Sequence, residues 1–347
     1  MRRKGVGRDP PVVRAFTSGG DVSATAPSTP VPPPGEQGTF QHEALFYAGD
    51  ESFLAGTVPF VRDGVAAGEP VLVVLPPVRL TLLRAALGGD AAHVAFADMA
   101  EVGRNPARII PAWHAFLAQH GGGSRPVRGI GEPIWAGRRP AELVESQRHE
   151  TLLNLAFAGS GSWRLLCPYD VDALGPAVVE EAERSHPFVT ATGRRQASER
   201  CLDLETMARP FDVPLPPAPP GAAELPFGGA ELGAVRRFVT RLGRQAGLDD
   251  IRTDDLALAV HEIASNSVRH AHRGGVVTVW EDDGAVVVEV RDPGRIEDPL
   301  VGREQAPPDR PDGRGIWLAN HLCDLVQIRT FPTGNVIRLH LRSRPTL

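Results

Sequence analysis

A proline-rich run constrains the fold of this 347-residue chain more than any other feature of its sequence. The run reads PFDVPLPPAPP and extends from Pro210 to Pro220. Because proline fixes φ and lacks a backbone N–H, such a run favours extended polyproline conformations and excludes a helix. A chain of this length also exceeds what one hydrophobic core usually serves. We therefore expect two domains, 39–190 and 222–347, joined by a connector over 191–221.

Composition and charge exclude several classes of protein. Hydrophobic residues make up 42% and charged residues 23% of the chain, as in soluble globular domains. A net charge of −5 provides no basic field, which disfavours direct binding of nucleic acid. No apolar stretch approaches the roughly 20 residues that span a bilayer, and the N-terminus lacks the apolar core of a signal peptide. We expect a cytoplasmic protein without membrane segments.

Cysteine usage agrees with a reducing compartment. Cys167, Cys201 and Cys323 are too few and too scattered for a disulfide framework or a zinc knuckle. A lone cysteine gives no support for a metal site.

The region before the proline-rich run combines a tail and a domain. Residues 1–38 are rich in Pro, Ser, Thr and Gly and poor in large apolar residues, so we expect them to be disordered. After them, short β-type runs alternate with helical patterns, which predicts an α/β domain with a mainly parallel sheet. We expect strands at Glu43–Tyr47, Pro70–Leu75, Val94–Asp98, Val127–Gly131 and Trp163–Cys167. Helices are expected at Glu51–Ala67, Val78–Leu87, Pro106–His120, Ala141–Ala158 and Pro176–His186.

The region after the run has a different order of elements. Hairpin signals stand at Asp282–Gly284 and at Pro332–Gly334. They predict an α+β domain with helices over one mixed, mostly antiparallel sheet. The expected elements, in order, are a strand at Ala222–Phe227, helices at Glu231–Ala246 and Asp254–His272, strands at Val276–Glu281 and Ala285–Arg291, a helix at Gly315–Leu322, and strands at Asp324–Thr330 and Gly334–Leu341.

A polar pair on the expected helix Asp254–His272 indicates magnesium chemistry. Thr253 can cap this helix, and Glu262 and Asn266 lie four residues apart, so their polar ends project together. An acid and an amide oxygen side by side can hold a hydrated Mg²⁺ ion and orient a nucleophile. Ser267 falls instead on the stripe that is expected to pack on the sheet.

Two glycine-containing turns complete the pattern. Asp292, at the end of a strand, can accept a hydrogen bond from an exocyclic amine, and Gly294 lets the chain turn close to a ligand. Gly313 and Gly315 precede a helix, where backbone N–H groups bind phosphate. Each signal is weak by itself, because a Glu and Asn on a helix are more often a solvated face and such glycine motifs are usually turns. Their ordered combination predicts a nucleotide site.

These motifs resemble the three boxes of the GHKL (Bergerat) ATPases. HEIASNSVRHA resembles the N box, RDPG the G1 box and DGRGIWLANHL the G2 box, in the same order and with similar spacing over residues 224–343. The resemblance implies the Bergerat fold, with ATP and Mg²⁺ as cofactors. It also implies Glu262 as the general base or water-orienting carboxylate, Asn266 as the Mg²⁺ ligand and Asp292 as the adenine reader. Further nucleotide contacts are implied at Gly294, Gly313 and Gly315.

Within the GHKL group, the domain is most similar to the anti-sigma-factor serine kinases. It has no long lid insertion, no topoisomerase-like extension and no preceding dimerisation helix with a phosphorylatable histidine. The resemblance implies a protein serine/threonine kinase that phosphorylates a STAS-type anti-anti-sigma partner and sequesters a sigma factor in transcription regulation. The G1 box departs from the family pattern, because Arg295 stands where many relatives have a second glycine. We expect a lower nucleotide affinity from this departure.

Two alternatives to kinase activity stay open. The domain can be a non-catalytic ATP-binding module that captures a sigma factor or its antagonist, an alternative that the Arg295 departure keeps open. It can also belong to a sensor histidine kinase. Such a kinase needs a phosphorylatable histidine on a helix before the ATPase domain, but His270 and His272 lie inside the N-box helix and Glu231–Ala246 contains no histidine. The sequence leaves open the identity of the partner, the oligomeric state, including a homodimer, and the direction of regulation.

The N-terminal domain resembles the MEDS (methanogen/methylotroph, DcmR sensory) domain. The resemblance lies in His42–Tyr47, VLVVLPP, GIGEPIWAGR, ESQRHETLLNLAF and LLCPYD. It implies a RecA-like core, here without a P-loop, and a small-molecule ligand whose identity the sequence leaves open. Several polar residues stand at strand ends, where open α/β sheets bind ligands. The sensory candidates are His42, Glu132, Trp135, His149, Cys167 and Tyr169.

Structural roles are the alternative for three of these candidates. Trp135 is more often a core residue, His149 more often a surface residue of a helix, and Cys167 more often a small buried hydrophobe.

Overall fold

The chain forms two compact units. The computed structural model describes residues 40–120, 126–209, 213–271, 274–304 and 314–343. The expected disordered tail, 1–38, lies outside the described residues. The first unit contains the described residues of Met1–Val102, Ala112–Arg138 and Phe157–Cys201, and the second those of Gly103–Pro111, Arg139–Ala156 and Leu202–Leu347.

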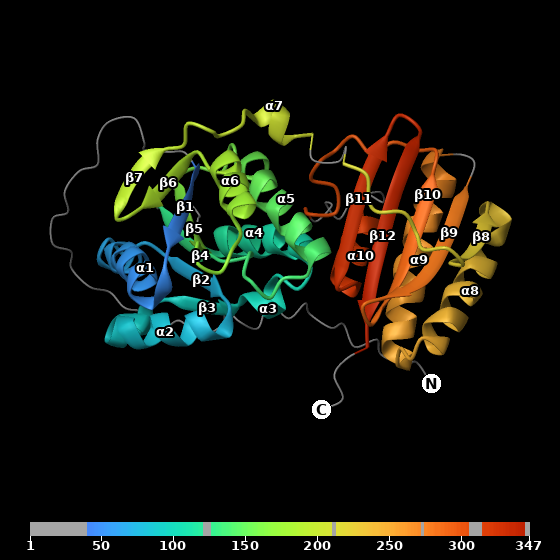
Figure 1. Cartoon of the computed structure of the whole chain (residues 1–347), viewed down its shortest axis with the longest axis horizontal. Coiled ribbons are helices and arrows are strands. Elements are labelled where there is room, and N and C mark those ends of the chain that lie inside the picture. Colours follow the sequence, from blue (N-terminus) through green and yellow to red (C-terminus); the bar gives the residue numbers. More distant parts are fainter. Residues whose placement is uncertain (1–39, 121–125, 210–212, 272–273, 305–313, 344–347) are drawn as a thin grey trace. The chain divides into compact units, whose positions relative to one another are not determined.

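The first unit is built on a mainly parallel sheet, as its sequence pattern predicts (Figure 1). In the described part of the chain this sheet has seven strands in the order β3-β2-β4-β5-β1-β6-β7, and only the β6–β7 pair is antiparallel. The run VLVVL is buried at every position because β2 lies inside the sheet. The strands are β1 (Phe40–Tyr47), β2 (Val71–Leu75), β3 (Ala95–Asp98), β4 (Val127–Gly131), β5 (Trp163–Asp170), β6 (Phe188–Ala191) and β7 (Arg194–Ala197).

All five expected strands of this region are confirmed, and the hairpin β6–β7 was missed. Its strands have four residues each, and RRQA is polar, so neither carries a strand pattern. The turn between them places Thr192 and Gly193 at positive φ. The helices of the unit are α1 (Gly49–Ala66), α2 (Pro77–Leu87), the 3-10 helix η2 (Gly88–His93), α3 (Met99–Val102), most of α4 (Ile109–His120) and α6 (Pro176–Ser185).

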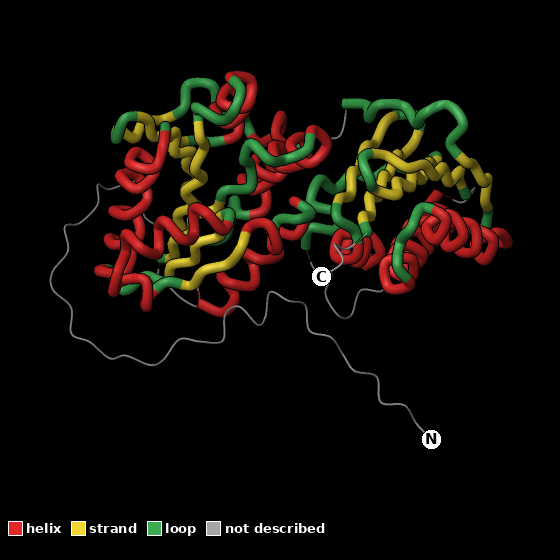
Figure 2. The backbone as a smooth tube through the Cα atoms, turned by 60° about the horizontal axis from the view of Figure 1, so that its bottom comes forward, coloured by secondary structure: helices red, strands yellow, loops and turns green. Residues whose placement is uncertain are grey.

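The second unit is an α+β layer structure, also as predicted. Its described strands form a five-stranded antiparallel sheet in the order β11-β12-β10-β9-β8. Figure 2 shows the long helices of the unit on one side of this sheet. The strands are β8 (Ala223–Phe227), β9 (Gly275–Asp282), β10 (Ala285–Asp292), β11 (Leu325–Phe331) and β12 (Gly334–Arg342). The helices on the sheet are α8 (Leu232–Gln245), α9 (Asp250–Ala271) and α10 (Arg314–Leu322). Shorter or separate elements are η3 (Pro106–Arg108), α5 (Pro140–Ala156), α7 (Leu204–Met207) and η4 (Gly229–Glu231).

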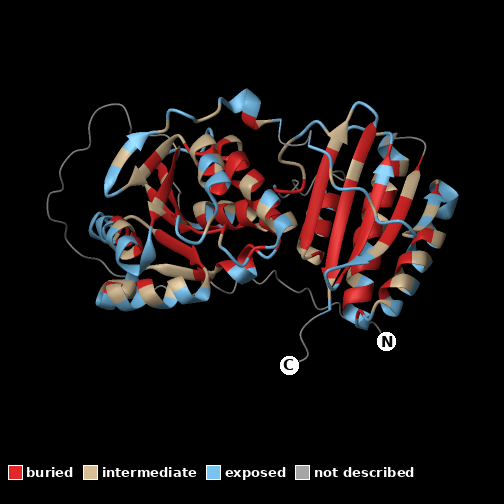
Figure 3. Cartoon of the chain, in the orientation of Figure 1, coloured by how far each residue is buried: buried red, intermediate tan, exposed pale blue. Residues whose placement is uncertain are grey.

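The turns of the second sheet follow the predicted hairpin chemistry. Asp283 and Gly284 both have positive φ, which the two-residue turn between β9 and β10 requires. The apolar core lies between the sheet and its helices, with Val288 of β10 and Ile263 of α9 among its members. Figure 3 shows buried residues along the central strands and the inner sides of the helices.

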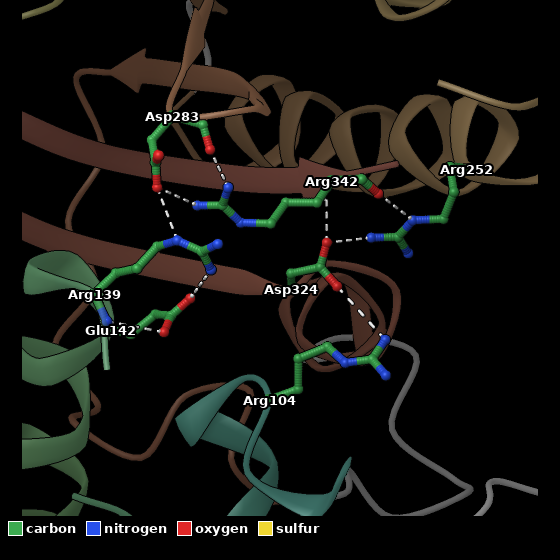
Figure 4. A network of polar contacts seen from close by, with 7 residues as sticks. All are labelled: Arg104, Arg139, Glu142, Arg252, Asp283, Asp324 and Arg342. Atoms are coloured by element: carbon green, nitrogen blue, oxygen red, sulfur yellow. Dashed lines mark hydrogen bonds and ion pairs between the residues drawn. The ribbon is translucent and has the colours of Figure 1, made fainter. Parts of the chain in front are cut away.

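Helix α9 begins earlier than the sequence suggested. Asp249, and not Thr253, accepts a hydrogen bond at the start, from the backbone N–H of Arg252 at 2.7 Å. Thr253 is fully buried inside the helix. The Arg252 guanidinium contacts Asp324 and donates to the backbone oxygen of Arg342 at 3.1 Å (Figure 4). These contacts tie the first turn of α9 to the ends of β11 and β12.

The described part of the proline-rich run, 213–220, contacts the sheet. Arg329 of β11 donates to the backbone oxygen of Val213 at 2.8 Å, and Arg338 of β12 donates to that of Pro216 at 2.7 Å. Hydrogen bonds from two strands of the C-terminal sheet therefore fix the position of this segment beside the sheet. Among the described residues, no helix is both long and apolar enough to cross a membrane.

Candidate functional site

Three of the predicted nucleotide-site residues meet where α9 and α10 touch. Glu262 and Asn266 are half-buried on α9, and Gly315 stands in the first turn of α10. A Cβ atom at Gly315 would lie 2.7 Å from Asn266 Nδ2 and 3.4 Å from Glu262 Oε2. The helix start approaches the polar pair this closely because glycine has no side chain. An acid, an amide and a helix N-terminus therefore converge at one rim of the domain.

Asp292 is held in one orientation by three donors. It ends β10 and is 9% exposed. Its Oδ2 accepts from Ser267 Oγ at 2.8 Å, and its Oδ1 accepts from the Gly294 N–H at 2.7 Å and from Asn335 Nδ2 at 3.1 Å. A carboxylate fixed in this way keeps a defined acceptor direction for a ligand amine.

A second layer of contacts supports this carboxylate. Asn335 lies opposite Asp292 in the register of β12 and β10. Its Oδ1 accepts from Thr330 Oγ1 at 2.8 Å and from the Ile296 N–H at 3.1 Å. The sequence reasoning missed Asn335 and Thr330, and it assigned Ser267 to packing alone. The hairpin register, which places Asn335 beside Asp292, is the signal that could have found Asn335.

The segment after Asp292 packs against α10. Gly302 has φ +70°, and a Cβ there would lie 2.4 Å from Ile316 Cγ2. Asn320 Nδ2 donates to the Gly302 oxygen at 2.8 Å. Gly313, predicted at the phosphate side, lies outside the described residues.

The one departure from the G1 pattern points away from this site. The Arg295 side chain is 68% exposed, and its Nε lies 3.7 Å from Glu297 Oε1. The arginine therefore does not fill the space between Asp292 and the helices.

Family comparisons agree with this arrangement. A family model described as a histidine kinase-like ATPase domain matches residues 226–341. A second model, described as MEthanogen/methylotroph, DcmR Sensory domain (MEDS), matches residues 41–187. The chain carries a MEDS domain followed by a histidine kinase-like ATPase domain.

Among the solved structures that are similar to part of this MEDS–ATPase chain is a mycobacterial one. It is the crystal structure of the RsbU and RsbW domains of Rv1364c from Mycobacterium tuberculosis, with 22% sequence identity and a TM-score of 0.29. The match covers 37% of this chain and 34% of that one, about a third of its length. None of the curated proteins matches the chain significantly.

In the MEDS domain, the structure brings two sensory candidates together. Cys167 Sγ on β5 lies 3.4 Å from His42 Nε2 on β1. Tyr169, two residues further along β5, is buried and presents its ring edge to His186 at a centroid distance of 5.6 Å. His42, Cys167 and Tyr169 therefore share one region of the sheet.

Glu132 belongs to a separate polar group at the carboxyl ends of the strands. Tyr47 OH donates to Glu132 Oε1 at 2.8 Å, while Oε2 has no partner among the described residues. Burial raises the pKa of Glu132 to about 8. Arg79 lies over the Tyr47 ring at 5.0 Å and pairs with Asp170 at 3.0 Å. The strand ends thus hold a neutral acid beside an ion pair, at the edge where open α/β sheets bind ligands.

Two structural alternatives from the sequence are wrong. Trp135 is not a core residue, because it is half-exposed. The Arg138 guanidinium carbon lies over its ring, 4.0 Å from the ring centroid. His149 is not a surface residue of α5, because it is 1% exposed. The alternative for Cys167 is right as to burial, since it is 1% exposed, but its sulfur faces an imidazole and not only apolar groups.

Proposed function

We propose that the ATPase domain binds Mg-ATP and transfers the γ-phosphoryl group to a serine of a STAS-type anti-anti-sigma partner. Under this proposal the protein is a cytoplasmic anti-sigma regulator whose activity responds to a ligand of the MEDS domain, and phosphorylation of the partner leaves a sigma factor sequestered. The observation that carries the proposal is the convergence of Glu262, Asn266 and Gly315 beside the fixed carboxylate of Asp292.

Each residue has one task in this proposal. The side-chain oxygen of Asn266 fits Mg²⁺, which prefers oxygen ligands, and the ion when bound would neutralise phosphate charge. Asp292 accepts a hydrogen bond from the adenine amine, and the backbone N–H at Gly315 faces the phosphates at a helix N-terminus.

Phosphoryl transfer to serine requires a proton acceptor. The serine oxygen attacks the γ-phosphorus, the bond from that phosphorus to the bridging oxygen breaks, and ADP leaves. Glu262 takes the hydroxyl proton as the new bond forms. Its half-buried position at the rim supports this role, because a partner's serine can reach it there.

Calorimetry with the full chain tests nucleotide binding. Asn266→Ala removes the proposed Mg²⁺ ligand, and we expect the affinity for Mg-ATP to fall at least about tenfold, equivalent to about 1.4 kcal/mol. His270→Ala, an exposed change on the same helix, is the matched control and should bind as the wild type. Equal affinity in Asn266→Ala and the wild type would refute the site.

A basic helix face favours the second candidate, a module that captures its partner without chemistry. A surface pocket on α8 is lined by Arg236, Arg237, Arg241 and Arg244, together with Thr240 and Gln245. Arginines at this density fit an acidic protein surface.

Incubation with labelled ATP and a STAS-type partner separates the candidates. Acid-stable phosphoserine on the partner supports the kinase, and stable binding without transfer supports the module. Acid-labile label on this chain itself would favour a histidine kinase instead.

A further inference from the structure

Three side chains of types that can bind a metal ion meet inside the first unit. His42 lies on β1, Cys167 on β5, and His186 directly after α6. Their ligand atoms lie within 4.8 Å of one another. None of the three side chains is more than 1% exposed. The group is remote in sequence from every residue of the nucleotide site.

The sheet register explains how two of them meet. Strands β1 and β5 are parallel neighbours, with His42 opposite Leu165 and Ala44 opposite Cys167. His42 and Ala44 point to the same face because side chains alternate along a strand. His42 and Cys167 are therefore diagonal neighbours on one face, and their Nε2 and Sγ atoms are 3.4 Å apart.

This separation matches shared coordination of one metal ion. With a zinc–nitrogen bond of about 2.0 Å, a zinc–sulfur bond of about 2.3 Å and a tetrahedral angle, the two donor atoms stand about 3.5 Å apart. The observed 3.4 Å needs little adjustment.

His186 has the orientation and tautomer of a ligand. Its Nδ1 lies 2.8 Å from the backbone oxygen of Ala182, which can only accept, so Nδ1 carries the proton. The lone pair of Nε2 is then the one available to a metal. Metal-binding histidines usually donate their second ring nitrogen to a carbonyl or carboxylate in this way. The His186 and His42 ring centroids are 3.9 Å apart.

Aromatic rings of the first unit pack against the group. Phe40 stacks on His42 at 5.6 Å and on Trp163 at 4.6 Å, and the edge of Tyr169 faces His186. A cation bound by the two imidazole nitrogens and the sulfur would hold the thiol as thiolate.

We propose that His42, Cys167 and His186 bind a divalent transition metal, with zinc as the expected ion because the donors are nitrogen and sulfur. This site is independent of the proposed Mg-ATP site. It gives the MEDS domain an inorganic component that composition and cysteine spacing did not indicate.

Metal content and cobalt spectroscopy of the full chain test the site. After incubation with ZnCl₂ and dialysis, the wild type should retain about one zinc ion per chain. With Co²⁺ it should show ligand-field absorption and a thiolate-to-cobalt charge-transfer band. Cys167→Ala should lose this band and bind zinc at least about 100-fold more weakly. Cys201→Ala, a half-buried cysteine outside the group, is the matched control.

A second variant tests the site independently, in case Cys167→Ala does not fold. His186→Gln keeps the sulfur, so the charge-transfer band should survive with weaker zinc binding, provided that far-ultraviolet circular dichroism shows a folded chain. Should both variants misfold, the wild-type spectrum decides. A wild type that retains no zinc, a cobalt form without a thiolate band, or folded variants that retain zinc like the wild type would each overturn the proposal.

Discussion

Asp292 shows how one residue of the proposed nucleotide site depends on its neighbours. Ser267→Ala removes the donor to Oδ2 and leaves the two donors to Oδ1 in place. Hydrogen bonds to charged groups contribute about 1.5–3 kcal/mol, so we expect ATP affinity to fall about tenfold. Calorimetry on Ser267→Ala, with Ser265→Ala, two residues earlier on α9, as control, measures this. Affinity within twofold of the wild type would mean that the orientation of Asp292 does not depend on Ser267.

Glu132 makes the stability of the first unit depend on pH. Its pKa rises from 4.5 to about 8 on burial. Between these values the folded state binds more protons than the unfolded chain, so the free energy of unfolding falls as pH rises through this window. Glu132→Gln stays neutral, keeps an acceptor for Tyr47 and should lack this loss, which is on the order of a few kcal/mol.

Urea unfolding of the wild type and Glu132→Gln at pH 5 to pH 9 measures the difference. The variant should gain stability relative to the wild type as pH rises. Glu51→Gln, an exposed acid on α1, controls for the change in net charge. A constant difference between wild type and Glu132→Gln across this range contradicts the prediction.

Sequence spacing indicates which residues lie side by side only where those residues are close along the chain. Glu262 and Asn266 share a helix face, so their spacing alone placed them together. The group of His42 and Cys167 was not foreseen, because these residues are 125 positions apart and only the strand order brings them into contact. Burial of His149 likewise depends on which face of α5 the rest of the chain covers.

At the scale of elements, the packing of the segment after β10 on α10 rests on one glycine. Gly302→Ala forces a Cβ against Ile316 and also strains a positive φ. We expect a loss of about 1–3 kcal/mol in the free energy of unfolding. Gly247→Ala has a similar φ of +82° but no atom within 4 Å, so it shows the backbone cost alone. Chemical denaturation of both variants separates the contact from the backbone effect. Equal losses would mean that the contact with Ile316 has little energetic weight.

Element types followed from sequence more reliably than element ends. The buried run of β2 and the turn at Asp283 and Gly284 carry strong local signals, and both were predicted. The start of α9 was misplaced because several acidic residues and Thr253 could each cap the helix in the sequence. Only the hydrogen bond from the Arg252 N–H to Asp249 in the structure shows which residue does so. The path of residues 213–220 was also open, since a polyproline segment has no pattern that indicates which surface it contacts.

At the scale of the whole molecule, two compact units, each with its own proposed ligand, predict separate unfolding transitions. A ligand that binds only the folded state stabilises by RT ln(1 + [L]/Kd), about 2.7 kcal/mol at 100 times Kd. For domains of this size that shifts a midpoint by several degrees. Mg-ATP should therefore raise one transition in calorimetry, and zinc the other.

The same experiment carries its own controls. Asn266→Ala should abolish the shift caused by Mg-ATP and keep the shift caused by zinc, and Cys167→Ala should do the reverse. If either ligand raised both transitions equally in the wild type, the chain would unfold as one cooperative block. Ligand binding to the MEDS domain would then change the stability of the ATPase domain, because both would unfold together. The two-domain expectation from the proline-rich run would be wrong.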